Sequence, residues 1–337
     1  MTQHASHPRR HDLGGVRAQD DEAGLADMLD LDAEVLGSYL DEVTEWIGQH
    51  VPDVPRTVVD VGAGTGTGSL ALARRFSTAE VVAIDTSALL LDRLRAAARE
   101  QGLAERLRVV QADLDVAWPE VGAFDVAWAA SSLHHVADPD RVLGDIHAAL
   151  DPGGLLVVVE VDVFPRFLPH DVGLGRPGLE ARCHEALAQA NWNSHPDWQP
   201  HLARAGFDIA EQHTFSIEVS PASPSAGRYA HAFLHRVRAA LDGVLAADDL
   251  TTLDHLLADD SSDALLRRDL MVRGSRTAWA ARRPEPAVAG SLPLHHDASS
   301  RGADALGVHP QGTVVWQQPT SPGQARPQDG LEEGRSS

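Results

Sequence analysis

The chain of 337 residues is long enough for one large domain or two small ones, and its single cysteine excludes an intrachain disulfide. Its 49 acidic residues outnumber the 28 basic ones, and the formal net charge of -21 would repel nucleic-acid phosphates. No run approaches the roughly 20 apolar residues that span a bilayer, and the N-terminus lacks the apolar stretch of a secretory signal. These features favour a cytoplasmic protein that binds neither nucleic acid nor a membrane.

The two ends of the chain differ in composition from its middle. Residues 1–26 are expected to form a disordered leader, because the chain begins polar and rich in His and Arg. Residues 284–337 are rich in Pro and Gly, which predicts a disordered tail. The folded domain is therefore expected over 27–283. Between 18 and 50, apolar residues recur at helical spacing, which predicts an acidic amphipathic helix packed on the domain.

From residue 56 onward, short apolar runs alternate with amphipathic helices. Five runs are predicted to be strands: 57–61, 80–84, 107–110, 124–129 and 154–161. Ser87 and Asp138 stand where they can cap the helices after the second and fourth runs. Near-continuous apolar strands are typical of a parallel sheet covered on both faces, so we expect a doubly wound α/β fold. In such a fold the ligand lies at the carboxyl ends of the strands.

A glycine-rich turn, VVDVGAGTGTG, follows the first predicted strand. Such a turn lets a ligand lie against bare backbone. A dinucleotide-binding fingerprint would need glycine where Thr67 or Ser69 stands. The carboxylate of Asp60, at the end of the strand, is a poor neighbour for a pyrophosphate and a good one for an ammonium group. The turn therefore favours a cationic ligand over a diphosphate.

Two further aspartates follow the next two predicted strands. Asp85 can accept hydrogen bonds from both hydroxyls of a ribose, although a helix cap or turn is the structural alternative. Asp113 can reach the amine of an adenine, and the neighbouring Asp115 competes with it for this role. The three acids are thus expected along one edge of the sheet.

Five motifs follow one another along the chain: VVDVGAGTG, AIDTS, QADLD, FDVAWAASSLHHVADPDRVL and ALDPGGLLVVVE. In this order and spacing, over 57–161, they resemble the motifs of class I S-adenosylmethionine-dependent methyltransferases of the small-molecule type. LARAGF (202–207) followed by a strand, and SRTAWAARRP (275–284), resemble the family's last two strands. The resemblance implies a Rossmann-like sheet of seven mostly parallel strands, the last one antiparallel. It also implies a cofactor-binding core over 55–161 and helical lid insertions over 162–200 and 221–272.

The resemblance further implies which residues bind the cofactor, S-adenosyl-L-methionine. They lie on the glycine turn and at the strand ends: Asp60, Gly62, Ala63, Gly64, Gly66, Asp85, Thr86, Ala112, Asp113, Leu114, Ala129 and Ser131. The turn amides would face the methionine part, Asp85 the ribose and Asp113 the adenine. Ala129 and Ser131 would flank the sulfonium.

Four other polar residues were considered as functional candidates. His134 follows the fourth predicted strand and is a candidate base, which methyl transfer needs only if the acceptor is protonated. His231 and His235 share a helix face but have no identifiable third ligand, so no metal site is expected. Cys183 is expected to be a small buried apolar residue.

Aromatic residues gather in the two insertions: Phe164, Phe167, Trp192, Trp198, Tyr229 and Phe233. They either pack the insertions as a core or line the pocket of an apolar or aromatic acceptor. The favoured function is methyl transfer to a small molecule by in-line displacement. The alternatives are a nicotinamide-dependent oxidoreductase and a non-catalytic regulatory protein that binds S-adenosylmethionine. The acceptor and the oligomeric state do not follow from the sequence.

Overall fold

A computed structural model describes residues 15–51, 53–189, 197–219, 224–268 and 270–286. The predicted leader lies outside the described residues over 1–14, but helix α1 (Gly15–Val35) begins inside it. The first described helix therefore begins before the predicted boundary at residue 27. Of the predicted tail, 287–337 lies outside the described residues. Within the part of the chain that the structure describes, no helix is long and apolar enough to cross a membrane.

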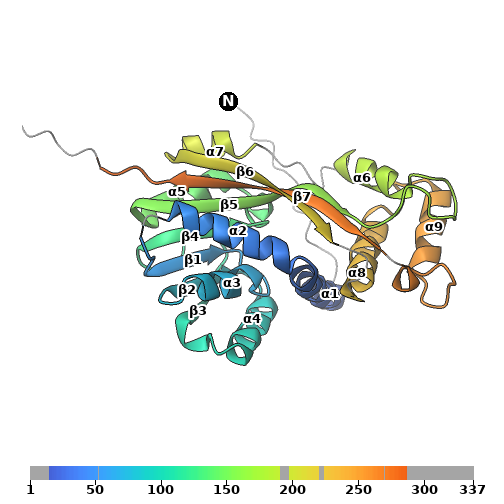
Figure 1. The fold of residues 1–337 in the computed structure, drawn as a ribbon, viewed down its shortest axis with the longest axis horizontal. Helices are drawn as coiled ribbons and strands as arrows, with labels where there is room; N and C mark the ends of the chain where they lie inside the picture. Colours follow the sequence, from blue (N-terminus) through green and yellow to red (C-terminus); the bar gives the residue numbers. More distant parts are fainter. Residues whose placement is uncertain (1–14, 52, 190–196, 220–223, 269, 287–337) are drawn as a thin grey trace, which may run out of the picture. The chain divides into compact units, whose positions relative to one another are not determined.

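Seven strands form one sheet in the order β3-β2-β1-β4-β5-β7-β6 (Figure 1). Their bounds are β1 Thr57–Val61, β2 Glu80–Asp85, β3 Leu107–Gln111, β4 Phe124–Ala130, β5 Leu150–Arg166, β6 Asp208–Val219 and β7 Val272–Arg282. Strands β1 to β5 pair in parallel, and β7 runs antiparallel to both β5 and β6. The predicted sheet is thereby confirmed, with β5 longer at both ends than the predicted run 154–161.

Helices cover both faces of the sheet (Figure 1). On one face, α2 (Gly37–His50) contacts β6 and β7, α3 (Thr67–Arg75) contacts β1 and β2, and α4 (Ala88–Glu100) contacts β2 and β3. On the other, α5 (Pro139–Ala149) and α7 (Gln199–Arg204) pack beside each other, and α7 contacts β6. The described residues also include three short 3-10 turns: η1 Ala104–Arg106, η2 Leu133–His135 and η3 Leu265–Arg267.

Both predicted helix caps are confirmed. The hydroxyl of Ser87 accepts a hydrogen bond from the Leu90 amide at 3.1 Å, and Asp138 accepts one from the Arg141 amide at 3.0 Å. These bonds satisfy amides that the first turn of a helix leaves without a partner. Each cap begins a helix directly after a strand end and so fixes the turns on which the candidate site is built.

The single amphipathic helix predicted near the N-terminus is two helices, α1 and α2, that meet at Leu36. The apolar positions behind that prediction are buried or partly buried: Met28, Leu31, Val35, Leu36, Leu40, Val43 and Ile47. The prediction that this segment packs on the domain is therefore confirmed. The break lets one segment cover two surfaces, because α2 lies on the sheet while α1 reaches α8 (Pro224–Ala240) and α4.

The predicted insertions divide differently in the structure. Helices α6 (Leu179–Gln189), α8 and α9 (Ala247–Leu257) gather at the far end of β5 and β7, away from β1 to β3 (Figure 1). Helix α7 begins at the end of the predicted insertion 162–200, at Gln199, and it packs beside α5 and β6. The first insertion also begins only after β5 ends, at Arg166.

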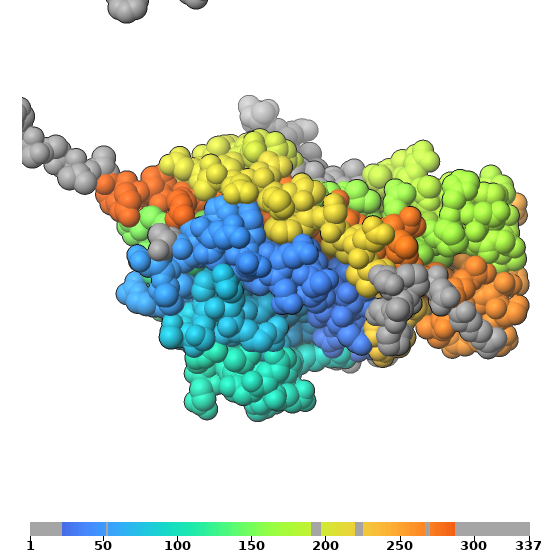
Figure 2. Space-filling model, viewed as in Figure 1, coloured from blue at the N-terminus to red at the C-terminus, as the bar shows by residue number. Residues whose placement is uncertain are grey.

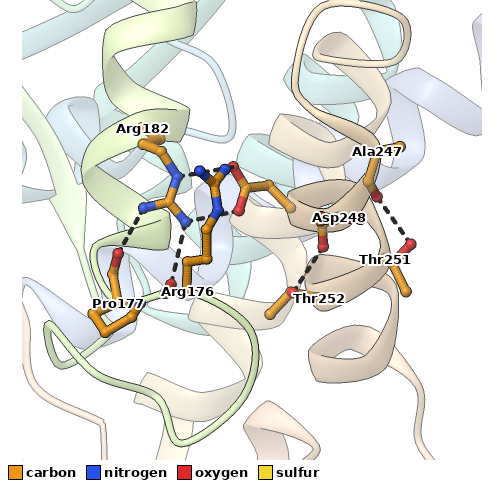
Figure 3. A network of polar contacts seen from close by, with 8 residues as sticks. Arg176, Pro177, Arg182, Ala247, Asp248, Thr251 and Thr252 are labelled. Carbon is orange, nitrogen blue, oxygen red and sulfur yellow. Dashed lines mark hydrogen bonds and ion pairs between the residues drawn. The ribbon is translucent and has the colours of Figure 1, made fainter.

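A buried carboxylate joins α6 to α9 (Figure 3). Asp249 is 2% exposed and accepts from Arg182 through both of its oxygens, at 2.8 and 2.7 Å. Arg176 donates to the same carboxylate at 2.9 Å. Removing the charge of Asp249 would leave both arginines without this buried partner, so the network stabilises the pairing of the two helices.

Candidate cofactor and acceptor site

The glycine turn after β1 is held by the end of β2. The amides of Gly62 and Ala63 both donate to the Ile84 carbonyl at 2.9 Å. The amide of Gly64 donates to Asp85 Oδ2 at 2.8 Å. Two strand ends that are distant in the sequence are thus joined at the edge of the sheet where a doubly wound fold binds its ligand.

Two glycines of the turn are required by the close approach of neighbours. Gly62 and Gly66 have φ values of 75° and 92°. A side chain at Gly62 would meet Ser132 Cβ at 2.4 Å, and one at Gly66 would meet Leu94 Cδ1 at 2.0 Å. Only glycine fits both the backbone conformation and the space.

The four turn amides that were expected to face the methionine part of the cofactor have hydrogen-bond partners inside the protein. The amides of Gly62, Ala63 and Gly64 donate to the end of β2, and the Gly66 amide donates to the Ala63 carbonyl at 2.9 Å. These bonds fix the shape of the turn. The role of the four residues in binding the methionine part stays a prediction.

Asp85 is both a structural residue and a candidate ligand. Its Oδ1 accepts from the Ser87 amide at 2.9 Å, and its Oδ2 accepts from Gly64. Each carboxylate oxygen has two lone pairs, so each retains one after these bonds. Asp85 therefore stabilises the turn, and its carboxylate can still accept hydrogen bonds from two hydroxyl groups. Thr86, the next residue, is exposed.

The structure separates the two aspartates that follow β3. Asp115 accepts from the Ala137 amide at 2.7 Å and so holds the loop before α5. Asp113 is exposed and accepts only a local bond, from the Asp115 amide at 2.9 Å. The flanking Ala112 is half-buried, and Leu114 is buried. Asp113 is therefore the better placed of the two to contact a ligand.

Asp60 lies beneath the turn and is buried. Its Oδ2 accepts from the Ser69 hydroxyl at 2.6 Å. Burial raises the pKa of the Asp60 carboxyl to about 7, although the Ser69 hydrogen bond acts in the opposite direction. A cation bound nearby would favour the ionised form.

Ser131 follows β4 and has two unusual features. Its φ of 51° lies in the left-handed region, which is uncommon for residues other than glycine. Its hydroxyl is buried without a hydrogen-bond partner among the described residues. Strained residues and unpaired buried polar groups occur more often at ligand sites than elsewhere in a protein. Ala129, the other residue expected beside the sulfonium, is fully buried.

His134 is paired with a carboxylate that the sequence analysis missed. Its Nδ1 lies 2.7 Å from Oε2 of Glu160, which is on β5 and only 1% exposed. The other oxygen of Glu160 has no partner among the described residues. A single acid inside the apolar run GLLVVVEV is the signal that would have singled out Glu160. Burial lowers the pKa of the adjacent His135 to about 4, and the charge of His134 lowers it further.

Helix α1 lies over the glycine turn. Leu29 is the neighbour that a side chain at Gly64 would meet, at 3.4 Å. Arg93 of α4 donates to Asp27 and Asp30 of α1, both at 2.7 Å. Figure 2 shows the described part of α1, with α2, as a blue band beside the cyan and green surface of α3 and α4. The N-terminal helix therefore forms part of the wall of the candidate site.

The aromatic residues of the insertions pack mainly on one another. Phe167 lies 5.3 Å from Tyr229 and 5.5 Å from Phe233, and Phe164 lies 5.9 Å from Phe233, between ring centroids. Trp198 is buried on the opposite face of the sheet, in the cluster that includes α5 and α7. These residues follow the core-packing alternative. Trp192 lies outside the described residues.

The surroundings of the remaining candidate residues indicate structural roles. Cys183 is fully buried, and burial raises the pKa of its thiol to about 12, as expected for a packing residue. Nε2 of His231 hydrogen-bonds the Leu257 carbonyl at 3.1 Å. Among the residues that the structure describes, no three His, Cys, Asp or Glu side chains are grouped as a metal site requires.

The sheet order, the antiparallel β7, the glycine turn and the carboxylates at the ends of β1, β2 and β3 are the features expected of a class I S-adenosylmethionine-dependent methyltransferase. Residues 58–154 match a family model described as "Methyltransferase domain".

Curated relatives show the same likeness. Demethylmenaquinone methyltransferase of Thermus thermophilus is 36% identical over 113 residues, which are 33% of this chain and 50% of that protein. Trans-aconitate 2-methyltransferase of Variovorax paradoxus is 34% identical over 135 residues, or 39% of this chain and 50% of that protein. The chain thus spans about half the length of these relatives.

One solved structure to which the chain is similar is geranyl diphosphate C-methyltransferase from Streptomyces coelicolor. It is 18% identical, with a TM-score of 0.41 over 72% of this chain and 77% of that one.

Proposed function

We propose that this protein transfers a methyl group from S-adenosyl-L-methionine to a small-molecule acceptor. The observation that carries the proposal is the glycine turn joined to Asp85, whose carboxylate keeps acceptor capacity at the sheet edge. The unpaired buried hydroxyl of Ser131 lies at the end of β4, which neighbours β1 in the sheet. The site suits a ligand with hydroxyl groups and a cationic centre.

Each side chain of the site receives a role under this proposal. Asp85 and Thr86 bind the ribose, and Ala112, Asp113 and Leu114 surround the adenine. Asp60 faces the methionine ammonium, and Ala129 and Ser131 flank the sulfonium. Gly62, Ala63, Gly64 and Gly66 form a turn that places no side chain larger than a methyl group in the path of the ligand.

The chain's main contribution to the reaction is alignment. The sulfonium already carries a good leaving group, so holding the acceptor atom, methyl carbon and sulfur in line at about 3 Å supplies much of the acceleration. The acceptor approaches from the side of α1 and of the insertions 162–200 and 221–272, which act as the lid. We also place the protein in the cytoplasm, where its buried thiol stays reduced.

Ligand binding tests the proposal first. Thermal-shift and calorimetric titrations with S-adenosylmethionine, S-adenosylhomocysteine, NAD(H) and NADP(H) should show binding of the first two only. Mass spectrometry of a metabolite extract incubated with methyl-labelled S-adenosylmethionine should then detect a labelled product. Binding of a nicotinamide coenzyme instead would make the protein an oxidoreductase, and cofactor binding without any labelled product would favour a regulatory role.

A further inference from the structure

We propose that Glu160 is a positioning residue that orients His134 as a general base, and that the methyl acceptor therefore reacts through a hydroxyl group. This inference rests on the proposed function. It assigns a role to a buried acid that the cofactor site does not use, and it narrows the acceptor to one chemical class.

The contact between the two side chains selects one ring tautomer. A carboxylate only accepts hydrogen bonds, so the Nδ1 of His134, 2.7 Å from Glu160 Oε2, carries the proton in this pair. The lone pair of the neutral ring then resides on Nε2, which becomes the basic nitrogen. The His134 side chain is 24% exposed while Glu160 is 1% exposed, so the histidine is the member of the pair that a ligand can reach.

Neighbours of both members of the pair are hydrogen-bonded at adjacent strand ends. Ser132, two residues before His134, donates its hydroxyl to the Val61 carbonyl at 2.6 Å, and its Cβ crowds Gly62. On the other side, the amide of Ser131 donates to the Val159 carbonyl at 2.8 Å, one residue before Glu160. The base is therefore fixed to the same strand ends as the residues expected around the sulfonium.

Two unpaired oxygens support a hydroxylated ligand. Glu160 Oε1 and Ser131 Oγ are both buried without a partner among the described residues. They belong to adjacent positions of the β4–β5 ladder, in which Ala130 pairs with Val159. An unpaired buried polar group carries a desolvation cost that a bound donor removes. A ligand with hydroxyl groups can donate to the carboxylate and also pair with the serine.

The reaction balances without any further reagent. The acceptor oxygen forms a bond to the methyl carbon as the carbon–sulfur bond breaks, and the electron pair of that bond stays on sulfur. The hydroxyl proton moves to Nε2 of His134, and the resulting imidazolium is stabilised by Glu160 until water removes the proton. A carboxylate acceptor is already ionised and would need no such base.

Variants test the role of the pair. The probe is the metabolite extract with methyl-labelled S-adenosylmethionine, followed by the acceptor purified from it. His134→Ala and Glu160→Gln should each lower kcat, by on the order of 100-fold or more for His134→Ala, with unchanged cofactor affinity in calorimetry. Glu160→Asp should recover part of the loss. Glu211→Gln is the matched control, because Glu211 makes a similar contact to His50, at 3.0 Å, away from the site. It should leave kcat unchanged.

A spectroscopic readout separates positioning from a purely structural role. The ring 15N shifts of His134 should report the Nδ1–H tautomer in the wild-type protein. In Glu160→Gln that preference should be lost, because an amide can both donate and accept. An unchanged tautomer, unchanged turnover in both variants, or a label found on a carboxylate or amine would overturn the inference. Absence of cofactor binding and of any labelled product would instead refute the proposed function.

Discussion

Asp60 is buried and its carboxyl has a raised pKa. The pH dependence of stability therefore tests the environment of this residue. Its pKa rises from 3.8 to about 7 on folding, so between these values the folded state binds more protons than the unfolded state. Its contribution to stability is therefore full below pH 4 and is lost as the pH rises to 7.

Asp60→Asn removes this titration. Relative to the wild type, the variant should gain unfolding free energy as the pH rises from 4 to 7, by on the order of 4 kcal/mol at most. Urea unfolding of both proteins across this range measures the difference. A constant difference would show that Asp60 has an ordinary pKa in the folded protein.

A second, independent prediction at the scale of single residues concerns Asp85. Asp85→Ala should weaken S-adenosylmethionine binding roughly 10- to 100-fold, because hydrogen bonds to a charged group contribute about 1.5 to 3 kcal/mol each. Calorimetry measures the affinity. The control is Asp92→Ala, which removes an exposed acid of α4 that pairs only with Arg95 on the surface. Equal affinities in the two variants would exclude Asp85 from the ribose site.

At the scale of elements, helix α1 is held by Asp32. Its carboxylate accepts from Arg276 of β7 at 2.9 Å and from the Tyr229 hydroxyl of α8 at 2.6 Å. Burial raises the pKa of Tyr229, so the hydroxyl remains a donor. The Arg276 guanidinium also lies 5.1 Å from the ring of Tyr39 in α2. One acid thus connects α1 to two elements outside the cofactor core.

Asp32→Asn should loosen α1, because it leaves the charge of Arg276 without its partner in a largely buried position. We expect faster hydrogen–deuterium exchange in α1 and weaker cofactor binding, since α1 lies over the glycine turn. Glu42→Gln, which changes an exposed acid of α2, should alter neither. Equal exchange in both variants would show that packing alone holds the helix.

At the scale of the molecule, the insertion helices have an ion-pair network of their own (Figure 3). Asp249→Ala should lower the unfolding free energy by about 2 kcal/mol, because two arginines lose a buried partner but retain access to solvent. Cofactor affinity should stay within twofold, since the network lies outside the cofactor turn. Asp254 lies on α9 like Asp249, and it forms an exposed pair with Arg238 of α8. Asp254→Ala should therefore cost less than about 1 kcal/mol. Chemical denaturation and calorimetry check both statements.

Much of the fold followed from local patterns in the sequence. The strands, the caps at Ser87 and Asp138 and the glycine turn depend on residues within a few positions of one another. Side-chain periodicity and turn chemistry act at that range. The core around β1 and β2 therefore agrees with the prediction almost residue for residue, whereas α1 and the ends of β5 do not.

The sequence by itself determined the sheet, its methyltransferase motifs and the acids at the strand ends. Only the tertiary structure decided that the turn amides point into β2, that the insertion aromatics pack on one another and that His134 meets Glu160. Each of these contacts joins segments distant in the chain. Residue type and local spacing do not specify such contacts, because they arise only when the sheet brings separate strand ends together.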